Sequence, residues 1–242
     1  MKFSHKLTIL LFTSLSFTSC SELDTILEET GLTNEEVIEG LRAALTVGSD
    51  TSVTTLSAVD GYLGDELVKV LLPPEADVIQ KNISKVPGGN LLIENAIKAI
   101  NRAAEDAAIE AKPIFVNAIT GITIEDGFGI LNGNNDAATE YLKVNTITDL
   151  IGAFEPKISA SLNKKLVGNV SAESTYSTLV TAYNVASLNG ILFPKVEANT
   201  LTSHTTDKAM DGLFLKVADE ELKIRTIASH RVNDILQKVF GG

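Results

Sequence analysis

The sequence predicts an all-α protein, a single multi-helix bundle of roughly nine to eleven helices around a central Ala-rich helix. Apolar residues recur at spacings of three and four along most of the chain, which is typical of helices with one buried face. Short breaks rich in Gly, Pro and Asn separate these segments, and no repeat of fixed period is present. With 242 residues, 44% of them hydrophobic, the chain can bury a substantial core.

The first element is predicted to be a lipoprotein signal peptide. Lys2 and Lys6 precede an apolar run at 7–17, which is too short to span a bilayer. The only cysteine, Cys20, follows the small residues Thr18 and Ser19. This pattern resembles the lipobox of bacterial lipoproteins, in which the cysteine is acylated and becomes the new N-terminus, although Phe17 replaces the usual Leu. An ordinary signal peptide with an unmodified cysteine is the alternative.

We therefore expect residues 1–19 to be removed, Cys20 to carry lipid, 20–32 to form an anchor linker and 33–242 to form one helical domain. Ser21 rather than Asp follows the cysteine, which by analogy with lipoprotein sorting favours the outer membrane. The body of this exported protein is expected in the periplasm or at the cell surface. Its expected partners are the membrane, through the lipid, and an envelope protein.

The elements before the central helix follow from capping and breaking residues. Thr33 and Glu36 form a capping box that begins the first helix. The next breaks predict a helix ending at Gly48, a Thr- and Val-rich stretch at 51–59, a turn at 60–64, and short helices at 65–71 and 75–86.

The central helix is predicted from Asn90 to Lys112, with a narrow apolar face made largely of Ala that lets other helices approach closely. Pro113 is expected to end it, because a proline disfavours the helical conformation of the residue before it. On the polar face, Arg102 lies three residues before Glu105, where helix side chains meet. This pair is interpreted mainly as a surface ion pair; the alternative is that Glu105 and Glu110 line a site.

The remaining elements are a helix at 114–119, a short helix capped by Thr123 and ending at Asn132, helices at 137–144 and at 146–166 with a kink at Pro156, a helix through Tyr176 and Tyr183, a surface loop at 189–202, and helices from Thr205 and from Arg231 to Phe240. The residues around Tyr176 also allow a strand, but their spacing favours a helix. The oxygen-rich loop after Asn132 fails the calcium-loop test, because Ala137 and Lys143 occupy the required Gly and Glu positions.

Composition excludes several function classes. The net charge is −11, and it becomes −13 when Lys2 and Lys6 are removed with the signal peptide, so nucleic-acid binding is disfavoured. If Cys20 carries lipid, the body has no thiol for a disulfide, a nucleophile or a metal ligand. We expect no cofactor and no metal; the sequence sets no oligomeric state.

Several short strings occur together in an order that resembles a known family. They are VIEGLR at 37–42, NRAAE at 101–105, AKPIF at 111–115, ILNG at 130–133, DAAT at 136–139, DGLF at 211–214, and Glu220-Glu221 with Ile224-Arg225. They resemble a family of bacterial secreted or lipid-anchored envelope proteins, domain of unknown function 4197, over roughly residues 33–241. The resemblance implies an envelope location and a helical fold, and it implies no activity.

No catalytic motif is present: no G-x-S-x-G elbow, Walker loop, G-x-G-x-x-G or H-E-x-x-H. His204 and His230 are interpreted as surface or capping residues. The polar residues within or beside the family strings form a candidate polar site: Arg102, Glu105, Lys112 and Asp211. The leading hypothesis is a non-enzymatic interaction or structural protein. The alternatives are a carrier of a small apolar ligand within the bundle and, less favoured, a carboxylate-dependent hydrolase.

Overall fold

The computed structural model describes residues 31–77, 80–81, 89–164, 171–186, 188, 190–191, 195 and 200–241. The predicted signal peptide, Cys20 and all but the end of the anchor linker lie outside these residues. The described part contains the α-helices α2 (Asn34–Ser57), α4 (Gly89–Ala108), α5 (Ala111–Thr120), α6 (Ile124–Leu131), α7 (Ala137–Leu162), α8 (Ala172–Ala186), α9 (Leu201–Thr226) and α10 (Asp234–Phe240), with 3-10 turns η1 (Pro74–Ala76) and η3 (Ala228–His230).

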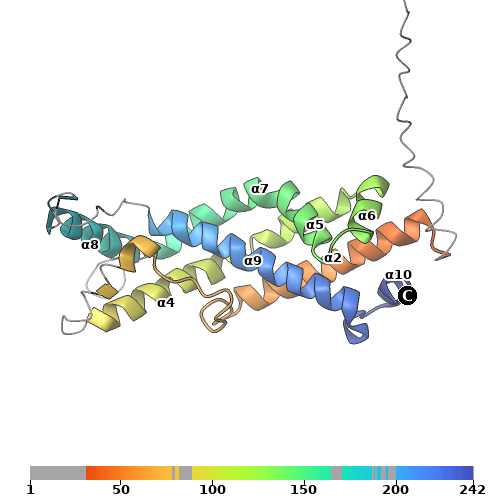
Figure 1. Cartoon of the computed structure of the whole chain (residues 1–242), viewed down its shortest axis with the longest axis horizontal. Coiled ribbons are helices and arrows are strands. Elements are labelled where there is room, and N and C mark those ends of the chain that lie inside the picture. The colour runs from red at the N-terminus through yellow and green to blue at the C-terminus, as the bar shows by residue number, and fades with distance from the viewer. Residues whose placement is uncertain are drawn as a thin grey trace, which may run out of the picture.

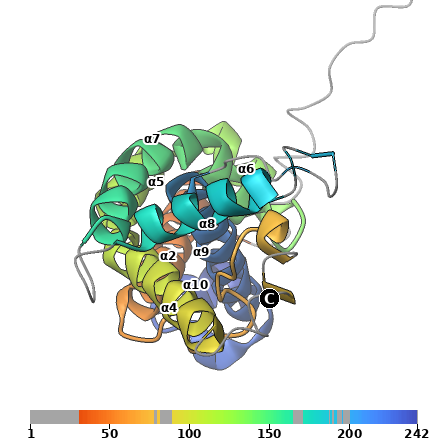
Figure 2. The ribbon, with the colours of Figure 1, turned by 90° about the vertical axis from the view of Figure 1, so that its left-hand side faces the viewer.

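Four long helices form the body of an elongated bundle (Figure 1). Helix α7 packs against α4 and α9, and α2 packs against α9 and α4, while the small side chains of α4 also let it reach α9. The end-on view in Figure 2 shows these helices gathered around one core. The predicted all-α class is confirmed, and the Ala-rich helix α4 is one of the four long helices, packed mainly against α7 rather than at the centre of the bundle.

Eight α-helices occur in the described residues, fewer than the predicted nine to eleven, because several predicted breaks are absent. Helix α2 begins at the predicted Thr33 capping box but continues through Gly48. Gly48 is buried, and a Cβ there would lie 3.5 Å from the Glu220 side chain of α9. That distance is an ordinary van der Waals contact, so the position does not require a glycine; the packing of α2 against α9 outweighs the low helix propensity of Gly48.

The two helices predicted at 137–144 and 146–166 are one helix, α7. Nothing interrupts it at Thr146, whose buried hydroxyl donates to the Leu142 carbonyl at 2.6 Å. Pro156 lies inside α7 on the exposed side, where water can satisfy the Gly152 carbonyl that loses its partner.

The predicted end of the Ala-rich helix at Pro113 is also wrong. Helix α4 ends at Ala108, and Pro113 lies in the first turn of α5. A proline clashes with the carbonyl four residues before it, which here is Ile109. The chain therefore breaks at Ile109 and Glu110, after which the missing N–H of Pro113 costs nothing in a new first turn.

The segment 65–71 is not the predicted helix. It contains a turn at Glu66–Val68 and then runs extended along α4. The buried Asn101 side chain accepts from the Val70 N–H at 2.8 Å and donates to the Val70 carbonyl at 2.7 Å. These bonds satisfy both backbone groups of Val70 without a helix. The helix predicted at 75–86 lies largely outside the described residues.

Helix α9 begins at Leu201, earlier than predicted, so His204 is helical and its ring nitrogen bonds the Leu71 carbonyl at 2.9 Å. Glu173 of α8 provides the reason. Its carboxylate accepts from the N–H groups of Leu201 and Thr202, which no helix carbonyl can reach. Most of the predicted 189–202 loop lies outside the described residues.

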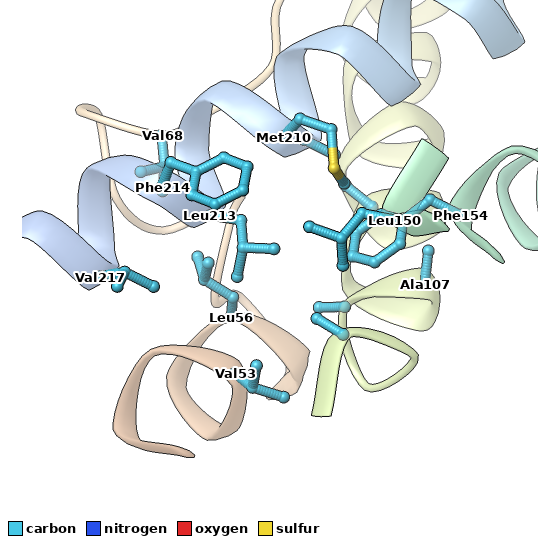
Figure 3. Packing of buried hydrophobic residues seen from close by; sticks show 14 of the residues in the cluster. Val53, Leu56, Val68, Ala107, Leu150, Phe154, Met210, Leu213, Phe214 and Val217 are labelled. Atoms are coloured by element: carbon cyan, nitrogen blue, oxygen red, sulfur yellow. The ribbon is translucent and has the colours of Figure 1, made fainter. Parts of the chain in front are cut away.

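The core is aliphatic, as the absence of Trp predicts. In Figure 3, Leu56 of α2 and Leu213 of α9 lie together, and Leu150 and Phe154 of α7 approach Ala107 of α4. All five side chains are fully buried. The helices are thus held by hydrophobic packing, and the polar residues considered next hold their ends and connections.

Candidate functional site

Arg102 and Glu105, two members of the predicted polar site, lie together on α4. The Arg102 guanidinium bonds the Glu105 carboxylate and, at 2.6 Å, the Asp60 carboxylate. Glu105 is only 5% exposed, and it also accepts from the backbone N–H groups of Tyr62 and Leu63, each at 3.2 Å. The pair is therefore a clamp that attaches the turn after α2 to α4.

The clamp is buried on its Glu105 side and partly exposed on its Arg102 and Asp60 side. Hydrogen bonding to Glu105, and then to Asp60, raises the pKa of the Arg102 guanidinium. Burial, with a further contribution from the charge of Glu105, raises the pKa of the Tyr62 hydroxyl far above its usual range. That hydroxyl donates to the Ala209 carbonyl at 2.9 Å, so it is a structural donor.

The other two predicted site residues form separate ion pairs. Lys112 pairs with Asp50 of α2, and Asp211 pairs with Lys208 on its own helix at 2.8 Å. Glu110, the alternative site carboxylate, pairs with Lys157 of α7 at 2.8 Å. The structure thus joins Arg102 to Glu105 but places no contact between that pair and Lys112 or Asp211.

A second clamp, Glu221 with Arg225 on α9, was not singled out as a site by sequence reasoning. The buried Glu221 carboxylate accepts from the N–H groups of Ala138 and Thr139 at 3.0 and 2.8 Å, at the start of α7. Arg225 bonds Glu221 at 2.8 Å and donates to the Ile130 carbonyl at the end of α6. The available signal was the four-residue spacing of Glu221 and Arg225 within a helix.

The carboxylates of both clamps are already engaged in hydrogen bonds. Each buried carboxylate already accepts from two backbone N–H groups and an arginine, which leaves it poorly placed to take a proton from a substrate. His204 bonds a backbone carbonyl, and His230 lies 4.0 Å from Glu220 beside η3. Within the described residues, no three His, Cys, Asp or Glu side chains are grouped closely enough to hold a metal ion.

The interior described by the structure has little free space. A cavity of about 10 Å³ lies between α2 and α9, with Leu41, Val217, Arg225 and Phe240 in its wall. This volume is near that of a single water-sized probe, far below that of an apolar ligand. The described interior therefore gives no support to the ligand-carrier hypothesis.

A larger hollow is open to solvent, with a volume of about 600 Å³. Its wall combines the loop between α6 and α7 with the outer side of α9, and its lining residues are Asn134, Asn135, Asp136, Leu215, Ala218, Asp219 and Leu222. Two leucines, Leu215 and Leu222, are partly exposed within its polar lining.

No single helix in the described ranges combines the length and apolarity needed to cross a membrane. Helices α5 and α6 meet that test only as a pair, and the chain bends by 106° between them.

A family model described as "Protein of unknown function (DUF4197)" matches residues 31–241. No curated protein and no solved structure matches the chain. The matched range covers the whole helical body, in agreement with the resemblance carried by the short sequence strings.

Proposed function

Because the chain belongs to the DUF4197 family, whose function is not known, we propose its role from its own residues: a lipid-anchored, non-enzymatic interaction protein of the bacterial envelope. One observation carries the non-enzymatic part of the proposal. The buried charged residues in the family strings, Glu105 and Glu221, bind backbone N–H groups that hold helix connections. In this chain these strings therefore contribute to the fold.

The anchoring part rests on the sequence around Cys20. A positive segment, a short apolar run and two small residues precede this sole cysteine, in the order used by lipoprotein signals. Several acyl chains at about 0.8 kcal/mol per buried CH₂ would hold the body at a membrane without a spanning helix.

Mass spectrometry of the protein from bacterial membranes tests the anchor. We expect a mature N-terminus at Cys20 carrying acyl chains, and we expect a Cys20→Ser variant to lack that mass and leave the membrane fraction. An unmodified Cys20 in the wild-type protein would refute lipid anchoring.

The non-enzymatic assignment is tested by screening the purified protein for hydrolase activity against ester, peptide and glycoside substrates. We expect no turnover above that of a Glu105→Gln preparation. Turnover that is specific to the wild-type protein, and lost in a Glu105→Gln variant that remains folded, would replace this proposal with the hydrolase hypothesis.

A further inference from the structure

Helix α9 is covered on most sides, and its exposed residues form one narrow stripe. Along the stripe lie Ser203, Asp207, Asp211, Leu215, Asp219, Leu222 and Thr226, with the exposed Lys208 beside it. Figure 1 shows α9 crossing the front of the molecule with no other helix drawn over it. Within the described residues, this face therefore carries three aspartates and two leucines with no other helix packed on it, and Lys208 pairs with Asp211.

The open hollow lies along the C-terminal half of this stripe. Leu215 and Leu222 contribute its apolar side chains and remain 46% and 40% exposed. They are separated by two helical turns, about 10 Å at the rise of an α-helix. A partner helix can place an apolar ridge of similar length between them and the loop at Asn134–Asp136.

The rim of the hollow is negatively charged. The exposed Asp136 carboxylate makes no hydrogen bond or ion pair within the described residues, and it does not cap α7. Asp219 and Glu220 share the single ammonium group of Lys223, each at 2.7 Å. The trio therefore keeps one negative charge. Of its members only Asp219 lines the hollow, where the other charged residue, Asp136, is also acidic.

We propose that this hollow docks an amphipathic helix of an envelope partner, with lysine or arginine beside an apolar ridge. This proposal depends on the interaction role proposed above, and it identifies the surface through which the interaction takes place. A second copy is disfavoured as the occupant, because each chain carries a net charge of −11. The anchor linker is disfavoured for the same reason, since residues 20–32 contain four acids and no Lys or Arg.

The test uses two synthetic helical peptides with the same leucine ridge, one flanked by lysines and the other by glutamates. We expect the lysine peptide to bind the full mature chain at least about tenfold more tightly than the glutamate peptide at low salt, and to lose affinity as salt rises. Fluorescence anisotropy of the labelled peptides measures both effects. Equal affinity for the two peptides, or no binding of either, overturns the proposal.

A pair of matched variants locates the binding. Leu215→Asp should lower the affinity of the lysine peptide by about tenfold or more. Val116→Asp on α5, at a position 48% exposed, should leave that affinity unchanged. Asp136→Lys should lower the affinity of the lysine peptide and raise the affinity of the glutamate peptide. An equal loss in Leu215→Asp and Val116→Asp would place the binding elsewhere and refute the assignment.

Sedimentation of the mature chain tests whether a second copy of the chain occupies the hollow instead. A concentration-dependent dimer that Leu215→Asp abolishes would assign the hollow to a second copy and overturn the proposed partner. The mass at Cys20 and the activity screens do not use these peptides, so the proposed function and this docking surface can fail separately.

Discussion

Replacing Glu105 by alanine tests whether this buried carboxylate holds the fold. The substitution removes the acceptor for the backbone N–H groups of Tyr62 and Leu63, both at 3.2 Å, and one partner of Arg102. Tyr62 is fully buried, so water cannot easily replace the lost acceptor. The turn after α2 then loses its attachment to α4.

The magnitude follows from these contacts. Leaving a buried donor unsatisfied costs about 1–3 kcal/mol, and breaking a buried ion pair costs about 3–5 kcal/mol. The Arg102 side chain is 31% exposed and keeps Asp60, so water screens part of its loss. We therefore expect a decrease of about 3 kcal/mol in the free energy of unfolding for Glu105→Ala. Glu105→Gln retains an oxygen acceptor and should lose about 1–2 kcal/mol.

Glu110→Ala is the matched control, because Glu110 forms a more exposed ion pair with Lys157. It should cost less than about 0.5 kcal/mol. Urea unfolding followed by far-UV circular dichroism measures all three variants, and the melting temperature of Glu105→Ala should fall by roughly 6–12 °C for a chain of this size. Equal stability of Glu105→Ala and Glu110→Ala would refute the clamp.

Two further stability changes follow from the structure. Gly40→Ala should destabilise the protein by about 1–2 kcal/mol, because the added Cβ would lie 2.5 Å from a Val239 methyl group of α10. Adding Val239→Ala should recover part of this loss in free energy of unfolding. If urea unfolding shows that the effects of the two substitutions simply add, the contact is contradicted. Asp65 bonds Lys216 at 2.5 Å, and this hydrogen bond, followed by one from the Leu67 N–H, lowers the pKa of the Asp65 carboxyl below its usual value of 3.8. A lowered folded-state pKa stabilises the protein above the unfolded pKa, and this contribution is lost as the pH falls through the folded pKa. Asp65→Asn should therefore destabilise the protein at neutral pH and differ progressively less from wild type as the pH falls below 3.8. A difference that stays constant as the pH falls, measured by pH-dependent urea unfolding, would argue against the assignment.

Local patterns predicted much of the fold correctly. The capping boxes at Thr33 and Thr123 both form, and the three- and four-residue apolar spacing identified α8 and α9 as helices. These features depend on residues close together in sequence, which is why they can be recognised without the fold.

Breaks were harder to predict than helices. Gly48 was expected to end a helix, but α2 continues through it because this stretch packs against α9, where Glu220 lies more than 170 positions away in sequence. Pro113 was expected to stop α4, but a proline is equally suited to the first turn of a new helix. The extended segment at Val70 depends on Asn101, a partner that local propensity cannot identify.

The candidate polar site shows the same limitation. Sequence spacing placed Arg102 beside Glu105, and the structure agrees, but the interpretation as a mainly solvated surface pair missed the burial of Glu105. The burial arises from Tyr62 and Leu63, whose N–H groups reach the carboxylate from a turn 42 residues earlier. Whether a charged pair is solvated or buried therefore depends on tertiary contacts that a single helix cannot report.

The first half of α2, which follows the proposed anchor linker in sequence, lies beside the C-terminal half of α9, where Leu41 and Val217 line one cavity. Helix α10 joins these two ends: Lys238 pairs with Glu36 at the start of α2, and Phe240 lies beside Arg225 near the end of α9. If Cys20 is lipidated, the twelve residues to Leu32 can extend at most about 40 Å from the membrane. A partner helix in the hollow would then also lie near the membrane, which favours a membrane-associated protein as the source of that helix.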